Sequence, residues 1–149
     1  MIEEIYDYLR EYGFSKEELK YFELYNEKIF FVNLETVKRN ISFLTEKGLN
    51  NQEIINVCKE NPFMITVSNS KLEKIDKILA EDIGIGHYSL KNIILNNPDT
   101  YTVSVSELSK IVEYLKENNY SNEKIKTLFI DNPKVINMSF NSFKNNYNI

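Results

Sequence analysis

The sequence predicts an all-α protein in which four helix pairs, each packed near a right angle, stack as an α-solenoid. The first observation is a repeated motif, Asn-Pro plus six residues ending in Ser, at 61–68, 97–104 and 132–139. A fourth copy, at 26–33, has Glu27 in place of the proline. The landmark positions 27, 62, 98 and 133 are 35, 36 and 35 residues apart. A nearly constant period in this range is typical of stacked helical repeats.

The second observation is a turn residue that lies fourteen positions before each landmark. These residues are Gly13, Gly48, Gly84 and Asn119, types that accept a left-handed backbone and end helices. Two positions later come residues that can cap the N-terminus of a second helix: Ser15, Asn50, Gly86 and Ser121. The spacing therefore predicts helices near 2–12, 16–25, 35–47, 51–60, 71–82, 88–96, 107–118 and 122–131.

Some of these helix starts have a glutamate three residues after the cap, which predicts capping boxes. The four candidate boxes are Ser15–Glu18, Asn50–Glu53, Ser70–Glu73 and Ser104–Glu107. At each helix end, Asn-Pro stops the second helix, because proline pushes the preceding residue out of helical geometry. A short buried segment, such as a 3₁₀ turn, is expected to follow.

Apolar residues recur at fixed distances from the landmark, and residues at one such distance form a column. The second helices carry two buried columns, Leu19, Ile54, Leu90 and Ile125 with Phe22, Val57, Ile93 and Leu128. After the landmark come the pairs Phe30/Val32, Ile65/Val67, Tyr101/Val103 and Ile136/Met138. The first helices carry Ile5, Tyr8, Leu9; Ile41, Phe43, Leu44; Ile75, Ile78, Leu79; and Ile111, Tyr114, Leu115. This spacing predicts one core along the stack.

The repeats are expected at about 1–33, 34–69, 70–105 and 106–140, in a single domain without a linker. The third repeat fits the pattern only if one extra residue lies within 80–86, which accounts for its length of 36 residues. Residues 141–149 resemble the start of a fifth first helix, with Phe143 in a core column. We expect this tail to cap the last repeat, because an open solenoid end exposes core.

Composition narrows the class of protein. A hydrophobic content of 42% with 27% charged residues is typical of a globular chain, and no apolar run is long enough to span a bilayer. The N-terminus is acidic and amphipathic, unlike a signal or transit peptide. The single cysteine, Cys58, excludes an internal disulfide and suits a reducing compartment. We therefore expect a cytoplasmic protein with no membrane association.

The repeat unit resembles that of the mitochondrial transcription termination factor (mTERF) family. The resemblance rests on the three Asn-Pro motifs, each with an apolar residue three positions after the proline (Ile65, Tyr101 and Ile136), and on the turn glycines. It covers nearly the whole chain. It implies two antiparallel helices and a short 3₁₀ helix in each repeat, stacked into a curved left-handed superhelix. It also implies binding of DNA or RNA through a basic concave groove.

A basic column lies twelve residues after the landmark in the first helices. It consists of Arg39, Lys74 and Lys110, with Asn145 in the fourth copy, and the neighbours Lys38, Lys77 and Lys144 widen it. A solenoid turns such a column into a stripe, which predicts contacts to phosphates. The alternative is that these lysines only solvate their helices. Although the net charge is −4, and duplex binders are usually basic, segregated positive charge could still bind nucleic acid.

An acidic column lies sixteen residues before the landmark, at Glu11, Glu46, Asp82 and Glu117. The favoured interpretation is structural, with these carboxylates near the free N–H groups of the following helix. The alternative is an acidic rim that binds a basic protein. Tyr12, Tyr25 and Tyr120 are the aromatic residues expected to be exposed, where they could stack on bases or contact a protein.

No motif for catalysis, metal binding or a cofactor occurs in the sequence. His87 is the only histidine, Cys58 is expected to be a buried filler, and Gly84-Ile-Gly86 is a turn and no phosphate loop. We therefore expect no enzyme activity, cofactor or metal. The leading hypothesis is a scaffold that binds DNA or RNA through the basic column. The alternatives are a small acidic protein-interaction module, such as a phage-derived regulator, and self-association.

Overall fold

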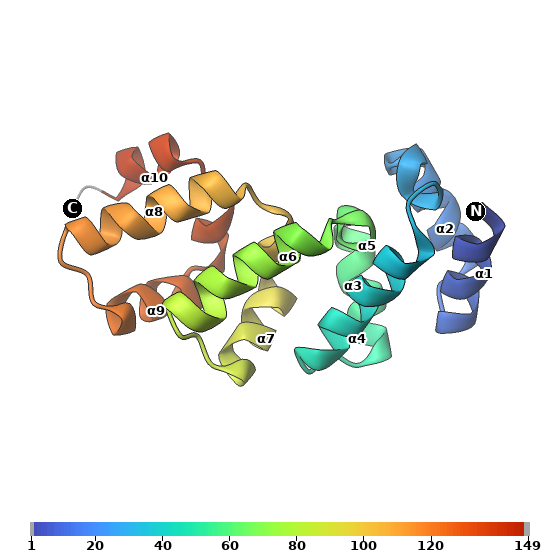
Figure 1. The fold of residues 1–149 in the computed structure, drawn as a ribbon, viewed down its shortest axis with the longest axis horizontal. Helices are drawn as coiled ribbons and strands as arrows, with labels where there is room; N and C mark the ends of the chain where they lie inside the picture. The colour runs from blue at the N-terminus through green and yellow to red at the C-terminus, as the bar shows by residue number, and fades with distance from the viewer. Residues whose placement is uncertain (1, 148–149) are drawn as a thin grey trace. The chain divides into compact units, whose positions relative to one another are not determined.

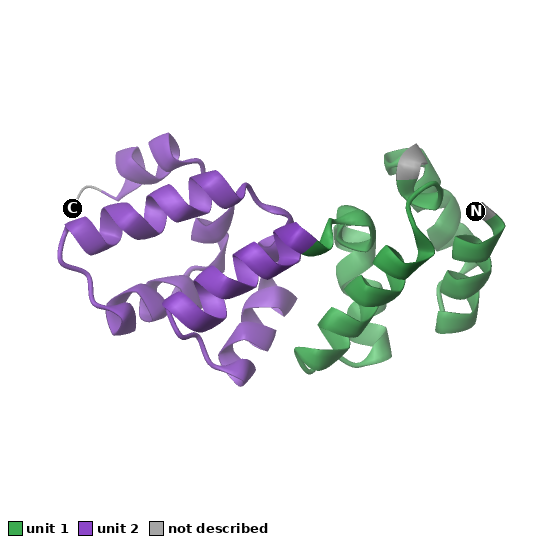
Figure 2. Cartoon of the chain, viewed as in Figure 1, with its two compact units in different colours: residues 1–69 green, residues 70–149 purple. Residues whose placement is uncertain are grey.

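The computed structural model describes residues 2–147, and all regular structure in that range is helical (Figure 1). The chain divides into two compact units, residues 1–69 and 70–149 (Figure 2). This division coincides with the boundary predicted between the second and third repeats. Unit 1 therefore contains the first two helix pairs, and unit 2 contains the other two and the C-terminal tail. The predicted all-α helical-repeat fold is confirmed.

The helices occur where the periodicity predicts them, with ends shifted by at most two residues. In unit 1 they are α1 (Ile2–Tyr12), α2 (Lys16–Tyr25), the 3₁₀ turn η1 (Glu27–Phe30), α3 (Leu34–Glu46), α4 (Asn51–Glu60) and the single turn α5 (Phe63–Thr66). Unit 2 is formed by α6 (Asn69–Asp76, whose first residue belongs to unit 1), η2 (Lys77–Asp82), α7 (His87–Asn96), η3 (Thr100–Thr102), α8 (Val105–Glu117), α9 (Asn122–Asp131), η4 (Pro133–Asn137) and α10 (Phe140–Asn146).

The tail forms the helix α10, which packs against α8 as a cap, as expected. Phe143 is fully buried, and its ring meets that of Tyr114 edge to face at a centroid distance of 6.3 Å. The Phe140 N–H donates a hydrogen bond of 3.1 Å to the Glu107 carboxylate of α8. Residues 148 and 149 of the predicted cap lie outside the described residues.

The four turn residues adopt the left-handed backbone that their types predict. Their φ angles are +131° at Gly13, +94° at Gly48, +82° at Gly84 and +67° at Asn119. The next residue closes each first helix by donating its N–H to a carbonyl one turn back, as Phe14 does to Leu9 at 3.0 Å. This hydrogen bond is the signature of a Schellman C-cap, so the turns between paired helices are fixed locally.

The extra residue of the third repeat is accommodated by a π-helical turn. Residues 77–82 form η2, in which the Ile83 N–H donates to the Ile78 carbonyl at 3.0 Å. The Ile85 N–H then bonds to the Leu79 carbonyl, six residues back, whereas the equivalent bond from Phe14 to Leu9 spans five. A π turn inserts one residue without breaking the helix. The π turn begins at Lys77, three residues before the stretch 80–86 in which the extra residue is predicted, and it overlaps that stretch.

The Asn residue of the motif has nearly the same backbone conformation in all four copies. Its φ lies between −134° and −147° and its ψ between 71° and 85°. Asn26 adopts this conformation although Glu27, not proline, follows it. In every copy the Asn N–H donates to the carbonyl four residues back, at 2.8 or 2.9 Å. Proline favours the bend, but the first copy shows that the bend does not require it.

The motif also joins consecutive repeats, because the Asn side chain bonds to the next copy of the motif. In unit 1, the Asn26 amide donates to the Thr66 hydroxyl at 3.4 Å. In unit 2, Asn97 and Asn137 exchange two amide hydrogen bonds of 2.9 and 2.8 Å, and Asn97 also donates to the Pro133 carbonyl at 3.0 Å. The sequence pattern predicts only a helix stop at this motif. Its second role depends on contacts forty residues apart, which a linear pattern does not show.

The predicted core columns lie inside the two units. In the second helices, all four residues of the column that begins with Leu19 are buried. In the column that begins with Phe22, only Leu128 is partly exposed. In each pair after the landmark the first residue is buried. The second residue is buried only in the second repeat, at Val67, and Val32, Val103 and Met138 are partly exposed. In the first helices, Tyr8, Phe43, Ile78 and Tyr114 are likewise half-buried at the core margin. The alignment by landmark therefore identifies most of the core and errs at its margin.

Two predicted capping boxes form completely and two do not. Ser15 with Glu18, and Asn50 with Glu53, make both reciprocal hydrogen bonds. Ser104 caps α8, but the Glu107 carboxylate accepts from Phe140 in the tail. The box at Ser70 is wrong, because α6 begins at Asn69 and Ser70 is already inside it. Ser121 caps α9 through its hydroxyl, while Gly86 holds the cap position of α7 without a side chain.

Candidate functional site

The basic column occupies exposed positions on the first helices. Arg39 lies on α3, Lys74 on α6 and Lys110 on α8, and the position of the fourth copy, Asn145, is exposed on α10. The flanking residues Lys38, Lys77 and Lys144 are exposed as well. None of these side chains is needed to fill the core, and all of them lie on the surface.

Several of these cations have a carboxylate or an aromatic ring beside them. Lys38 lies 4.0 Å from Glu35, Lys110 lies 3.5 Å from Glu107, and Lys77 lies 3.7 Å from Asp82. The Lys144 ammonium lies over the rings of Tyr114 and Phe140, 5.6 and 5.4 Å from their centroids. Surface ion pairs of this type contribute at most about 1 kcal/mol each.

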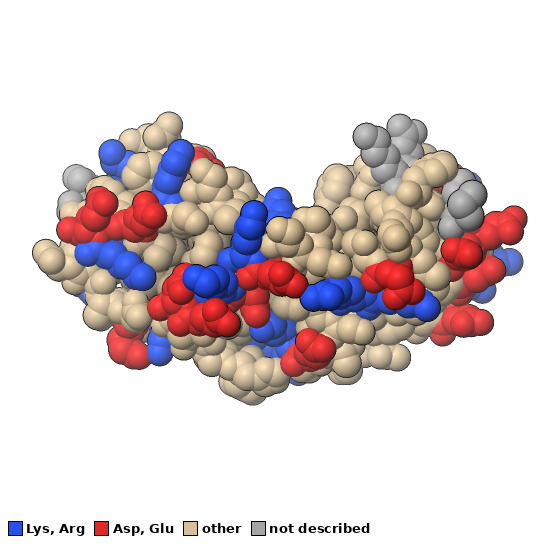
Figure 3. All heavy atoms as spheres, in the orientation of Figure 1, with Lys and Arg blue, Asp and Glu red and all other residues tan. Residues whose placement is uncertain are grey.

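Positive and negative side chains alternate on the face of each unit that Figure 3 shows, with lysines and arginines beside aspartates and glutamates. A duplex-binding surface is usually dominated by positive charge. The potential available to attract a phosphate backbone is therefore local, at individual cations, and a ligand must displace neighbouring carboxylates to reach some of them.

The structural interpretation of the acidic column is wrong. Glu11, Glu46 and Glu117 are exposed and make no hydrogen bond or ion pair to any residue that the structure describes. The Asp82 carboxylate pairs with Lys77, and its main-chain carbonyl accepts from Asn122. The N-termini of α2, α4 and α9 are capped instead by the side chains of Ser15, Asn50 and Ser121, and α7 has Gly86 at its cap position without a side-chain hydrogen bond.

Of the three tyrosines expected to be exposed, only Tyr25 is largely exposed. Tyr12 is half-buried, and its hydroxyl donates to the Asn51 amide oxygen at 3.1 Å, while burial raises the pKa of Tyr12. Tyr120 is also half-buried, with the Lys124 ammonium 4.3 Å from its ring centroid. Tyr12 therefore helps to join the first two repeats and is a poor candidate for base stacking.

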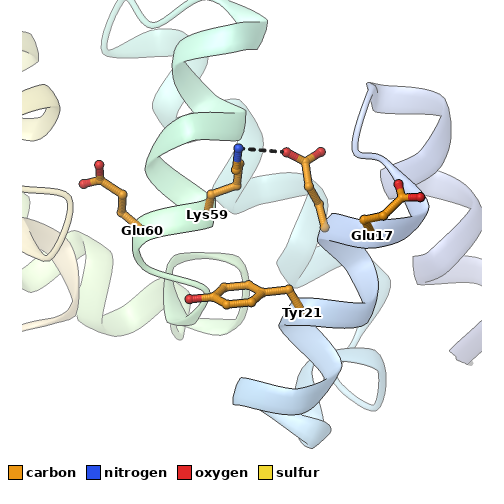
Figure 4. Close-up of a pocket in the computed structure, with 5 residues that line it drawn as sticks. Glu17, Tyr21, Lys59 and Glu60 are labelled. Carbon is orange, nitrogen blue, oxygen red and sulfur yellow. Dashed lines mark ion pairs between the residues drawn. The ribbon is translucent and has the colours of Figure 1, made fainter.

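A groove in unit 1 is absent from the sequence-based predictions. It has a volume of about 440 Å³ and is lined by Glu17, Glu18 and Tyr21 of α2 and by Lys59 and Glu60 of α4. Figure 4 shows Tyr21 extending from α2 toward α4, with Glu17 and Glu60 on opposite sides of the ion pair between Lys59 and Glu18. That ion pair has an N–O distance of 3.4 Å.

The column alignment contains the signal that could have revealed this groove. In the other three repeats the position of Tyr21 carries the polar residues Asn56, Asn92 and Thr127. The position of Tyr25 carries Glu60, Asn96 and Asp131. An apolar substitution outside the core columns indicates a surface specific to the first repeat. A search for columns with the same charge in every repeat overlooks such an exception.

No helix within residues 2–147 has both the length and the apolar character needed to cross a bilayer. The same range contains no cluster of three or more His, Cys, Asp and Glu side chains arranged to hold a metal ion. His87 is exposed at the first position of α7. Cys58 is fully buried, and burial raises the pKa of its thiol to about 12, as expected for a core filler.

The repeated helix pairs, their Asn-Pro joints and their exposed charged faces define a helical-repeat scaffold. A comparison with protein families matches the mTERF family over residues 35–149, which are 115 of the 149 residues. The chain belongs to the mTERF family. The matched region begins at the second residue of α3, so the repeat that lacks the proline lies outside it. A search among curated proteins finds no match.

Proposed function

We propose that this protein is a non-enzymatic scaffold that binds nucleic acid through the first helices of its repeats. The observation that carries the proposal is the exposed basic column in a member of the mTERF family. The residues proposed to contact phosphates are Arg39, Lys74, Lys110, Lys38, Lys77 and Lys144. Contacts of this kind position a nucleic acid without reading its bases.

The geometry supports contacts to phosphates in preference to bases. The ion pairs at Lys38, Lys77 and Lys110 are on the surface, so a phosphate can replace the carboxylate at little cost. Each phosphate neutralised releases counterions, and six contacts on duplex DNA would give a logarithmic salt slope of about −5. The net charge of −4 opposes binding at long range, so the affinity should be modest at physiological salt.

The experiment is a titration of dye-labelled duplex DNA, single-stranded DNA and RNA with the full chain at about 50 and 200 mM salt. Binding should weaken steeply with salt, and the triple variant R39E/K74E/K110E should lose it. The matched control K16E/K20E/K124E makes the same charge change at exposed lysines of second helices and should retain most of the affinity. Absence of binding by the unmodified chain at low salt would refute the proposal.

A second candidate function is the binding of a protein at the ends of the first helices. It is favoured by the exposed acidic column, because three of its four carboxylates have no partner among the described residues. The residues of this surface would be Glu11, Glu46, Asp82, Glu117, Tyr12 and Tyr120. The test is a stoichiometric partner whose capture survives nuclease treatment and is lost in E11K/E46K/E117K. Retention of that partner by the variant would exclude this surface.

A further inference from the structure

The helix α2 carries a second apolar stripe that the fold leaves uncovered. Leu19 and Phe22 face the core, whereas Tyr21, Leu24 and Tyr25 are 41%, 80% and 62% exposed. These three residues follow i, i+3, i+4 spacing, so they share one face of the helix. The rings of Tyr21 and Tyr25 lie 4.6 Å apart, and hydrogen bonding with Tyr25 raises the pKa of Tyr21. Contiguous exposed apolar side chains often mark a binding surface.

This apolar stripe borders the acidic groove between α2 and α4. The groove lining includes three carboxylates and one ammonium, a net charge of −2. The Lys59 ammonium is already paired with the Glu18 carboxylate. Burial by itself would raise the pKa of Glu18, but hydrogen bonds from Ser15 and Lys59 outweigh this effect, and the pKa is lowered. Glu17 and Glu60 have no hydrogen bond or ion pair with any described residue. Two uncompensated negative charges therefore flank the Tyr21 ring.

We propose that this groove is a docking site for a basic, apolar segment of a protein partner. An arginine or lysine side chain can lay its aliphatic stem along Tyr21 and place its charge beside Glu17 or Glu60, on either side of the Lys59–Glu18 ion pair (Figure 4). Apolar residues beside it in the partner would cover Leu24 and Tyr25. Charge selects this occupant, because the same carboxylates repel the phosphates of a nucleic acid.

The site differs from both surfaces considered above. It lies on second helices of unit 1, whereas the basic and acidic columns lie on first helices. In unit 2, Asn92 and Asp131 stand at the positions that correspond to Tyr21 and Glu60. Unit 2 therefore has the carboxylate but no aromatic ring at the position of Tyr21. A protein docked on α2 and α4 would leave the basic column of the chain open to a nucleic acid.

The probe is a dye-labelled synthetic peptide of alternating arginine and leucine, added to the full chain and followed by fluorescence anisotropy. Two further peptides, of glutamate with leucine and of arginine with serine, separate the contributions of charge and apolar contact. We expect saturable binding of the arginine–leucine peptide and at least tenfold weaker binding of the other two. Amide NMR shifts should change mainly in α2 and near Lys59 and Glu60.

The variants E17K/E60K and Y21A should each weaken this binding at least tenfold. The matched control variants N92A and D131K change the same columns in unit 2 and should leave it unaltered. All of these residues lie on the surface or at its margin, and circular dichroism of each variant verifies the fold. Equal binding by site and control variants, or no binding by any peptide, would each overturn the proposal.

Discussion

The two units join their repeats with the same motif but with different strength. In unit 1 an amide-to-hydroxyl hydrogen bond of 3.4 Å links Asn26 to Thr66. In unit 2 Asn97 makes three shorter hydrogen bonds, two of them a reciprocal exchange with Asn137. Asn97 is fully buried, whereas Asn26 is half-buried. A motif can therefore keep its backbone conformation in every repeat while the energy of the joint varies.

The difference follows from the residue that accepts the bond. Two facing carboxamides can each donate to and accept from the other, whereas the Thr66 hydroxyl donates to the Phe63 carbonyl and only accepts from Asn26. The buried partner in unit 2 is Asn97, since Asn137 is exposed and Pro133 is partly exposed, so this joint is most sensitive to changes that leave the Asn97 amide without its partners. Substitutions in the two units should therefore differ in their cost.

The largest expected effect is at the joint of unit 2. Asn97→Ala should lower the free energy of unfolding of that unit by about 2 kcal/mol, because it removes three hydrogen bonds made by a fully buried side chain. Asn26→Ala should cost less than about 1 kcal/mol in unit 1. Urea unfolding, with hydrogen exchange to assign the unit, measures both. Asn132→Ala, at the exposed last copy, is the control, and equal losses at all three positions would contradict the proposed difference between the joints.

The second effect compares the turn glycines of the two units. Gly13→Ala should cost about 2 kcal/mol, because its φ of +131° suits only glycine and a Cβ would lie 3.3 Å from the Ile55 Cδ1 atom. At Gly84, φ is +82° and the nearest atom is the flexible Lys126 Cε at 3.5 Å, so Gly84→Ala should cost about 1 kcal/mol. Thermal unfolding gives the order, and the reverse order would show that the backbone relaxes more readily in unit 1.

The third effect is a loss of stability at alkaline pH that begins at a different pH in each unit. Because burial raises the pKa of Cys58 from 9.0 to about 12, only the unfolded chain releases this proton between those values. Stability is thus complete below pH 9 and falls by up to about 1.4 kcal/mol per pH unit above it. In unit 2, burial and the nearby Asp76 raise the pKa of Tyr101 above its ordinary value of 10.0, so the fall begins later.

Urea unfolding at pH 8 and about pH 10, with the unit assigned by hydrogen exchange, measures this loss. The variant C58A should lose most of the change in unit 1 below pH 10, where the raised pKa values of Tyr8, Tyr12 and Tyr21 contribute little, and Y101F should lack the corresponding change in unit 2 at higher pH. The Cys58 thiol should also resist alkylation until the unit unfolds. Rapid alkylation of the folded chain would contradict the burial on which both expectations depend.

The smallest effect is a gain in stability. Gly86 caps α7 without a side chain, at φ −70° and ψ 162°, and a Cβ added at this position would meet no atom within 4 Å. Gly86→Ser should therefore add a cap like those at Ser15 and Ser121 and stabilise unit 2 by about 0.5 kcal/mol. Gly86→Ala is the control and should not stabilise. A higher midpoint of thermal unfolding for the serine variant alone is the expected result.

Much of the fold could be predicted because its determinants are local. Glycine at the turns, serine or asparagine at the caps and apolar residues at helical spacing act within a few residues of one another. The errors arose where a distant residue competed for the same group. Glu107 serves the tail in place of its own helix start, and Tyr12 is held by Asn51 of the next repeat.

The sequence by itself determined the positions of the helices and turns and most residues of the core. It did so because a period of about 35 residues aligns independent copies of one local solution. Only the tertiary structure decided that the motif asparagine joins neighbouring repeats, that a π turn absorbs the extra residue, and that an acidic groove lies beside the Tyr21 stripe. The joints and the groove depend on side chains that meet across about forty residues, and the π turn depends on main-chain hydrogen bonds that the sequence pattern does not specify.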